Sequence, residues 1–153
     1  EPKRLNDLVN LPGSNSKHGF VTRDGNGLYF ASDRREGLGG FDLYFVRLGQ
    51  DGQPYGRAIN LGSNINTVDN EEAPYFDLIT QTLYYSTNGK IGMGGLDVFM
   101  SEKNGANWSL PENMGFPVNS SKDDSYFTVS DVDNIGYLSS DRGHIWDTMY
   151  YLS

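Results

Sequence analysis

Two sets of polar residues recur along this chain at a constant spacing, and their side chains could bind a cation. Three residues with carboxylate or amide side chains each follow a short apolar run, and these are Asp33, Asn88 and Asp141. Three carboxylates each precede the next apolar run, and these are Asp42, Asp97 and Asp147. Carboxylates together with loop carbonyls are a ligand set that suits Ca²⁺. The alternative is that these side chains accept hydrogen bonds from backbone N–H groups of their own loops, as in Asx turns.

The repetition itself helps to choose between these two interpretations. The segment that holds the first pair, residues 28–44, recurs as residues 83–99 and, in a shortened form, as residues 136–150. A repeat of about 55 residues indicates an array of equal supersecondary units. Structural hydrogen bonds recur in every unit of such an array, whereas a functional site usually does not. We therefore predict a structural role for all six residues and no metal site, with Ca²⁺ binding as the alternative hypothesis.

Each unit contains four short runs of β-forming residues between turn clusters, and no segment shows a sustained helical period. We label the four expected strands of a unit a, b, c and d. They are residues 18–22, 28–32, 41–48 and 54–61 in the first unit, 75–78, 83–87, 96–101 and 108–114 in the second, and 126–129, 135–140 and 148–152 in the third. Residues 3–11 are expected to form a separate d strand, because residues 10–11 match the Asn-Leu pair that closes strand d at residues 60–61.

Four-stranded antiparallel units at this spacing are typical of β-propeller blades. The sequence therefore predicts an all-β fold with a single propeller-type domain, residues 1–153. Its blades are residues 18–61, 71–114 and 124–153, the last without its d strand. Because propellers have about 4–8 blades, either the chain is part of a larger propeller or two copies join head to tail into a six-bladed ring. In the ring, the strand at residues 3–11 of one copy completes the third blade of the other. We favour the larger propeller.

The composition argues against several classes of function. Twenty acidic and twelve basic residues give a net charge of −8, which disfavours nucleic acid or anionic lipid as the partner. The chain has no cysteine, which excludes disulfides, Cys-zinc sites and thiol chemistry. No apolar run approaches the roughly 20 residues of a membrane helix, so direct membrane insertion is not expected. The start at Glu1, without Met or a signal-peptide pattern, suggests a processed or trimmed product.

The repeated motif resembles that of a known family. Residues 28–34 read Leu-Tyr-Phe-Ala-Ser-Asp-Arg and residues 39–44 read Gly-Gly-Phe-Asp-Leu-Tyr, which resembles the TolB-like (WD40-like) β-propeller repeat. The Asn-Leu-Gly and Glu-x-x-Pro motifs within residues 60–74 are similar to those of OmpA-family envelope lipoproteins of the Bacteroidetes type. Residues 87–89 depart from the pattern, with Thr-Asn-Gly in place of Ser-Asp-Arg. The resemblance implies a binding or scaffolding module in the periplasm, at the outer membrane or on the cell surface.

Antiparallel geometry places the d–a and b–c loops at one end of the blades and only tight hairpins at the other. Binding residues are most often found on loops held by a rigid scaffold, so we predict that a partner binds this long-loop face. The candidate binding residues there are Glu71, Glu72, Asp123, Asp124, Lys17, Arg34 and Arg142. For the two arginines, pairing with an acid of a neighbouring blade is the alternative. Tyr75, Tyr126 and Trp146 are candidate aromatic platforms for a peptide or a sugar, with packing as the alternative.

Motifs of catalysis are absent from the sequence. His18 and His144 are its two histidines and lie in unrelated contexts, and no zinc-protease, nucleophile-elbow or phosphate-loop motif occurs. A propeller glycosidase needs two facing carboxylates, for which Asp77 and Glu72 are the nominees. We predict no catalytic residue and no cofactor, and a protein- or peptide-binding module of the bacterial cell envelope. The alternatives are binding of a carbohydrate or peptidoglycan fragment, and a glycosidase-like enzyme.

Overall fold

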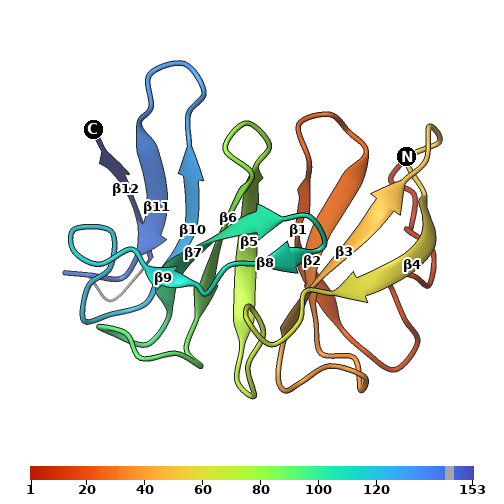
Figure 1. Cartoon of the computed structure of the whole chain (residues 1–153), viewed down its shortest axis with the longest axis horizontal. Helices are drawn as coiled ribbons and strands as arrows, with labels where there is room; N and C mark the ends of the chain where they lie inside the picture. Colours follow the sequence, from red (N-terminus) through yellow and green to blue (C-terminus); the bar gives the residue numbers. More distant parts are fainter. Residues whose placement is uncertain (144–146) are drawn as a thin grey trace.

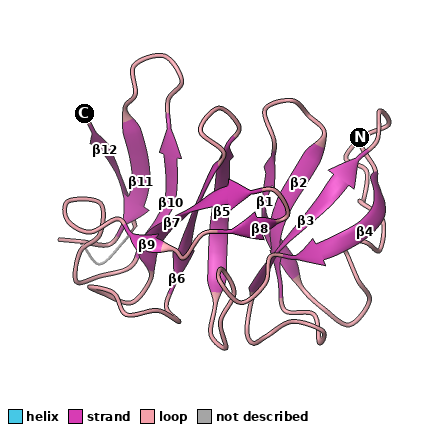
Figure 2. Cartoon of the chain, viewed as in Figure 1, coloured by secondary structure: helices cyan, strands magenta, loops and turns pink. Residues whose placement is uncertain are grey.

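The computed structural model describes residues 1–143 and 147–153. The described residues form twelve β-strands and no helix (Figure 2). These strands make three antiparallel sheets that stand side by side, which we call blades 1, 2 and 3 in chain order (Figure 1). The prediction of an all-β fold built from antiparallel blades is confirmed.

Within each blade the strands follow one another in sequence order. Blade 1 contains β1 (Ser16–Val21), β2 (Gly27–Ser32), β3 (Asp42–Leu48) and β4 (Pro54–Asn60). Blade 2 contains β5 (Glu71–Asp77), β6 (Thr82–Thr87), β7 (Asp97–Asn104), β8 (Asn107–Trp108) and β9 (Glu112–Asn113). Blade 3 contains β10 (Asp124–Val129), β11 (Gly136–Ser140) and β12 (Thr148–Leu152). Among the described residues blade 3 therefore has three strands, one fewer than blade 1, as the sequence predicts.

The outermost strand of blade 2 is interrupted. Residues 108–114 were expected to form one strand, but β8 and β9 pair separately with β7. Pro111 lies between them and has no N–H to donate to the ladder. The proline therefore accounts for the break.

The N-terminal segment forms a turn, and the strand predicted for residues 3–11 is absent. The N–H of Asn10 donates to the carbonyl of Asn6 (3.0 Å). The loop after blade 1 contains the same turn, in which the N–H of Asn66 donates to the carbonyl of Gly62 (2.8 Å). The prediction was wrong because blade 1 has two asparagines in this region, Asn60, which closes strand d, and Asn66, which lies in the turn. Asn10 is equivalent to Asn66 and not to Asn60.

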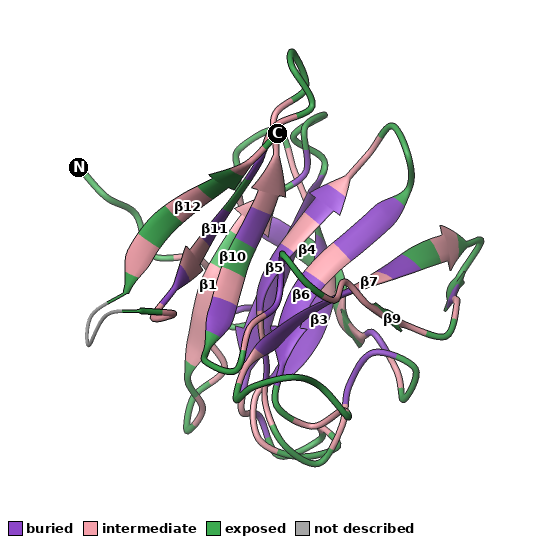
Figure 3. Cartoon of the chain, turned by 90° about the vertical axis from the view of Figure 1, so that its left-hand side faces the viewer, coloured by how far each residue is buried: buried purple, intermediate pink, exposed green. Residues whose placement is uncertain are grey.

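The core lies between the blades rather than inside any one of them. One hydrophobic cluster fills the space between blades 1 and 2, a second fills the space between blades 2 and 3, and a third covers the outer face of blade 1. In β2, Leu28 and Phe30 belong to the outer cluster, whereas Tyr29 and Ala31 belong to the cluster shared with blade 2. The central strands β2 and β6 are consequently buried on both faces, while β12 at the edge has no buried residue (Figure 3). This double burial explains why the b strands read as continuous apolar runs.

Buried asparagine amides fasten each blade to the next. The side chain of Asn66 accepts the N–H of Leu43 in β3 (2.7 Å) and donates to its carbonyl (3.0 Å). Asn119 makes the same pair of hydrogen bonds to Val98 in β7 (2.7 and 2.8 Å). Both side chains are almost fully buried. An amide that is satisfied at both its oxygen and its nitrogen fixes the geometry of the groups around it, so these joints hold the blades in register.

Candidate functional site

The side chains that end the b strands serve as structural acceptors. Each accepts the N–H of the residue just before strand a of its own blade: Asp33 from Asn15 (2.6 Å), Asn88 from Asn70 (3.0 Å) and Asp141 from Asp123 (2.9 Å). The acceptors thus tie the end of strand b to the start of strand a. These three side chains do accept backbone N–H groups, but the prediction of donors in their own b–c loops was wrong, because the donors lie in the d–a loop.

The acids that open the c strands of blades 1 and 2 are buried and bind their own loops. Oδ2 of Asp42 accepts the N–H of Leu38 (2.6 Å) and the side-chain amide of Asn60 (2.8 Å). Oδ2 of Asp97 accepts the N–H of Met93 (2.5 Å). For these two residues the predicted role in the loop is confirmed.

A cation site is not evident among the described residues. No group of three or more His, Asp or Glu side chains in residues 1–143 and 147–153 is arranged to hold a metal ion. The third acid, Asp147, is exposed. The second carboxylate oxygens of Asp42 and Asp97 are buried and have no partner in the described part of the chain. Both the prediction of no metal site and the alternative hypothesis of Ca²⁺ binding stay untested.

Two of the predicted binding residues are used inside the fold. Glu71 is fully buried and accepts hydrogen bonds from the hydroxyls of Thr67 (2.6 Å) and Thr87 (2.7 Å). Burial raises the pKa of the Glu71 carboxyl. Asp123 is exposed but accepts the N–H of Leu96 from blade 2 (2.8 Å). Both acids therefore have roles in holding the loops.

The arginines after the b strands are also held by the protein. Arg34 is buried and its Nη2 donates to the carbonyl of Val9 (3.0 Å). Arg142 donates in the same way to the carbonyl of Val118 and forms an ion pair with Asp124 (2.6 Å), which is fully buried. Arg142 therefore pairs with an acid of its own blade and not, as the alternative had it, with an acid of a neighbouring blade.

The remaining predicted binding residues lie on the first strands of the blades. Lys17 of β1 pairs with Glu72 of β5 (2.7 Å), and Nδ1 of His18 lies 3.7 Å from the other oxygen of Glu72. The His18 ring contacts Tyr126 of β10 edge-on, with ring centroids 5.0 Å apart. Burial lowers the pKa of His18 more than the Glu72 carboxylate raises it. The structure thus brings these four residues together, but the charges of Lys17 and Glu72 neutralise each other in an ion pair.

Of the other two aromatic candidates, Tyr75 packs between blades and Trp146 is not among the described residues. The hydroxyl of Tyr75 donates to the carbonyl of Val129 (3.0 Å), and its ring stacks on Tyr84 at 5.9 Å. Packing between blades 2 and 3 is therefore its observed role. Trp146, like His144, lies outside the described residues.

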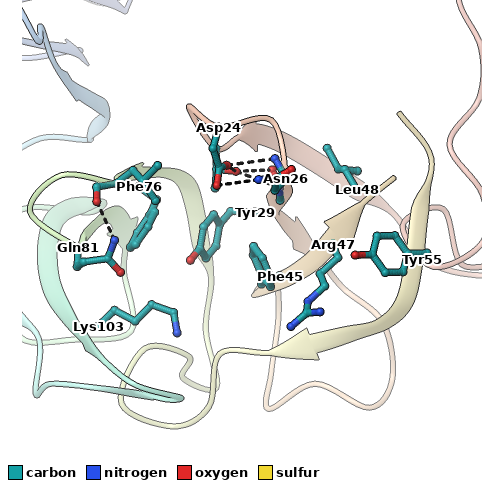
Figure 4. A pocket seen from close by; sticks show the side chains of 13 residues that line it. Asp24, Asn26, Tyr29, Phe45, Arg47, Leu48, Tyr55, Phe76, Gln81 and Lys103 are labelled. Atoms are coloured by element: carbon teal, nitrogen blue, oxygen red, sulfur yellow. Dashed lines mark hydrogen bonds between the residues drawn. The ribbon is translucent and has the colours of Figure 1, made fainter. Parts of the chain in front are cut away.

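A cleft between blades 1 and 2 opens at the end that carries the tight hairpins, opposite to the long loops (Figure 4). One part has a volume of about 340 Å³ and the adjoining part about 440 Å³. We call the two parts together the interblade cleft. Four residues line both parts, namely Tyr29, Phe45, Arg47 and Lys103. The sequence did not predict a site at this end.

Aromatic side chains from both blades form the floor of the interblade cleft. Tyr29 is 4.9 Å from Phe45 and 5.2 Å from Phe76 between ring centroids. Trp108 meets Phe76 edge-on at 6.0 Å. The Phe45 ring lies across Gly27, where a Cβ atom would overlap it. The floor therefore offers an apolar surface whose shape depends on a glycine.

Two basic side chains stand at the wall of the interblade cleft. Arg47 is exposed, and its side chain makes no hydrogen bond or ion pair within residues 1–143 and 147–153. Lys103 donates to the carbonyl of Gly105 (2.5 Å) and lies over the ring of Trp108 at 5.5 Å. The guanidinium of Arg47 is thus available to an acidic group from outside, and Lys103 adds positive charge beside it.

The other polar groups of the cleft include a neutral hydroxyl and a carboxylate. The hydroxyl of Tyr29 has no hydrogen-bond partner among the described residues, and burial raises its pKa, so it stays a neutral donor. The carboxylate of Asp24 is bound by the hydroxyl of Thr22 (2.6 Å) and the N–H of Asn26 (3.1 Å). These hydrogen bonds lower the pKa of Asp24, the Thr22 hydroxyl most of all. Among the described residues that line the cleft, Asp24 is the one carboxylate, and it is outnumbered by the two cations Arg47 and Lys103.

Comparisons with known proteins add little to this geometry. No protein-family model matches the chain, and no curated protein is similar in sequence. A solved structure of an α-L-arabinofuranosidase (CtGH43) from Clostridium thermocellum ATCC 27405 is similar in fold, with a TM-score of 0.44 and 17% sequence identity. The match covers 85% of this chain and 43% of the arabinofuranosidase, so the chain spans less than half of it. Within the described residues no helix is long and apolar enough to cross a membrane.

Proposed function

We propose that this chain is a non-catalytic binding module whose interblade cleft receives a segment of a partner protein or peptide. The segment carries an apolar or aromatic side chain next to a carboxylate. The observation that supports the proposal is that an unpartnered guanidinium, Arg47, and a floor of aromatic rings line the same cleft. Aromatic surface and arginine are the two features most enriched in the energetic centres of protein interfaces.

The charge distribution favours an acidic segment. The chain as a whole carries a net charge of −8, whereas the cleft wall carries Arg47 and Lys103. The rest of the surface carries a net negative charge that disfavours a carboxylate, whereas in the cleft Arg47 and Lys103 outnumber the carboxylate of Asp24. This difference in charge between the cleft and the rest of the surface would favour acidic segments and would direct them to the cleft.

The first experiment measures which peptide sequences the chain binds on an array of random dodecapeptides. The expected result is enrichment of Asp or Glu within one or two positions of Phe, Trp, Tyr or Leu. Binding should weaken as salt is raised, because an exposed ion pair is screened at high ionic strength. Enrichment of Lys or Arg, or no enrichment of any residue, would contradict the proposal.

Calorimetry on the best peptide then assigns the interaction to the cleft. The substitution Arg47→Ala removes the free guanidinium, and Arg57→Ala removes a comparable exposed guanidinium from β4, away from the cleft. A hydrogen bond to a charged group contributes about 1.5–3 kcal/mol, so Arg47→Ala should weaken binding about tenfold or more. Arg57→Ala should change the dissociation constant less than about twofold. Equal losses in both variants would show that net charge alone, and not the cleft, governs binding.

An acidic carbohydrate is the second candidate ligand, because the aromatic floor could also stack on a sugar ring. A glycan array that includes uronic acids separates the two ligands. Arg47-dependent binding of an acidic oligosaccharide, with no binding on the peptide array, would replace the peptide proposal.

Hydrolysis is the weaker proposal, because the nominated carboxylates have other roles. Asp77 accepts the N–H of Ile79 (2.8 Å) and the hydroxyl of Thr80 (2.8 Å) and thereby closes the turn after β5. Glu72 pairs with Lys17 (2.7 Å). From the resemblance of the repeat alone, we further propose the bacterial cell envelope as the place in which to look for the partner.

A further inference from the structure

The outer face of blade 3 exposes large apolar side chains in a way that the other blades do not. Tyr137 of β11 is 41% exposed, and Met149 and Tyr151 of β12 are 67% and 69% exposed. Tyr137 lies directly opposite Tyr151 in the antiparallel register. The three side chains therefore share one face of the sheet, and this face looks away from blade 2.

The equivalent face of each other blade is covered by the blade that follows it. In blade 1 the residues that correspond to Tyr137, Met149 and Tyr151 are Tyr29, Leu43 and Phe45. Tyr29 and Leu43 are 2% and 0% exposed, and they belong to the hydrophobic cluster shared with blade 2. In blade 2 the corresponding residues Tyr84 and Val98 belong to the cluster shared with blade 3. The face of blade 3 thus has the composition of a blade junction without its second half.

An asparagine turn at the start of the covering blade completes each junction. Asn66 and Asn119 bind both the N–H and the carbonyl of a residue in the c strand of the preceding blade. The N-terminal turn has the same shape, because the N–H of Asn10 donates to the carbonyl of Asn6 (3.0 Å). The side-chain amide of Asn10, however, donates to the carbonyl of Leu5 in its own segment (3.0 Å). The chain therefore holds one asparagine turn that does not bind a c strand.

The sequence alone favours a larger propeller, but this chain carries both halves of a junction, the uncovered face of blade 3 and the N-terminal turn packed on blade 1. We therefore propose that the exposed face of blade 3 receives blade 1 and the N-terminal turn of a second copy of this chain. In this head-to-tail contact the amide of Asn10 binds the backbone of Met149, as Asn66 binds Leu43 inside the chain. The contact joins two different surfaces, so it generates a closed ring if the rotation closes and an open chain if it does not. The chain already contains this kind of interface twice, between blades 1 and 2 and between blades 2 and 3.

The internal junctions also give a residue pair with which to test the contact. The N–H of Leu61 donates to the carbonyl of Leu43 (3.1 Å), so the two residues lie opposite each other at the end of the β3–β4 ladder. By position in the repeat, Leu5 and Met149 are the corresponding pair between copies. Cβ atoms of opposite residues in an antiparallel pair are about 4.5–5.5 Å apart, which is close to the separation that a disulfide requires.

The chain has no cysteine, so single cysteines report on this contact without interference. Leu5→Cys and Met149→Cys variants are prepared separately, mixed and oxidised in the presence of a glutathione buffer. The expected product is a disulfide between positions 5 and 149 of different molecules, identified by mass spectrometry of the digest. A product with only like-with-like disulfides, in the same yield as for each variant alone, would overturn the proposal.

Sedimentation of the unmodified chain over a concentration series provides the second measurement. Tyr151→Asp should weaken self-association at least tenfold, and Asn10→Ala should weaken it while lowering the unfolding midpoint of the monomer less than Asn66→Ala does. Ile79→Asp is the matched control, because Ile79 is 72% exposed on the turn after β5 and lies outside the proposed contact. A chain that stays monomeric at the highest concentration overturns the second copy as the occupant. Equal weakening by the control overturns the assigned face.

Discussion

Replacing Asn66 by alanine should destabilise the joint between blades 1 and 2. The change leaves the buried N–H of Leu43 without a partner, which costs about 1–3 kcal/mol. The carbonyl of Leu43 keeps a second donor, the N–H of Leu61 (3.1 Å), so it is not orphaned. The lost hydrogen bond from Asn66 to the side chain of Asn60 (2.9 Å) adds about 1 kcal/mol. The expected loss in the free energy of unfolding is therefore about 2–4 kcal/mol.

Urea unfolding measures this loss, and the repeat supplies its own controls. With a slope of about 1–3 kcal/mol per molar urea, the midpoint should fall by about 1–2 M. Asn119→Ala should behave alike, because Asn119 makes the same two hydrogen bonds to Val98. Asn10→Ala should cost less than about 1 kcal/mol at concentrations where the chain is monomeric, since it removes one partly buried hydrogen bond. Equal losses for all three variants would refute the idea that the amide joins blades.

Two further substitutions test the buried acid and the cleft floor. Burial raises the pKa of Glu71 in the folded chain. The contribution of Glu71 to the free energy of unfolding is therefore most favourable at a pH below its pKa in the unfolded chain, and it is lost as the pH rises through its pKa in the folded chain. Glu71→Gln should therefore gain stability relative to the unmodified chain as the pH rises from 4 to 8, whereas a constant difference in urea midpoints would contradict the raised pKa. Gly27→Ala should displace the ring of Phe45 and cost about 1–3 kcal/mol, with weaker peptide binding in calorimetry. Gly19→Ala meets only ordinary contact at 3.4 Å and should leave both quantities nearly unchanged; the same loss in both alanine variants would rule out the steric explanation.

The strands could be predicted from the sequence because their signals are local. Short apolar runs between glycine-rich and acidic turns gave β12 (Thr148–Leu152) at its observed bounds and β6 (Thr82–Thr87) to within one residue. The periodicity also predicted the missing strand of blade 3. The N-terminal turn was missed because a local match of Asn and Leu does not distinguish two asparagines that lie six residues apart in one blade. Only the backbone hydrogen bond from Asn10 to Asn6 separates them.

The site could not be predicted from the sequence because it depends on contacts between blades. Glu71 has the sequence context of an exposed loop acid, yet hydroxyls from Thr67 and Thr87 compensate its burial. Phe45 and Tyr29 have the pattern of core residues, and they become the floor of a cleft only because blade 2 leaves space beside them. The sequence signal that could have pointed to the cleft was the presence of two basic residues near the ends of c strands, Arg47 and Lys103, in an acidic chain.

The central claim is that a partner binds in the interblade cleft and not on the long-loop face. A peptide selected on the array, with a photoreactive phenylalanine analogue at its apolar position, is cross-linked to the unmodified chain and the adducts are mapped by mass spectrometry. The account predicts adducts within residues 22–29, 45–55 and 76–81, which contain lining residues of the cleft. Adducts confined to the long loops at residues 13–17, 62–72 and 115–124 would contradict it.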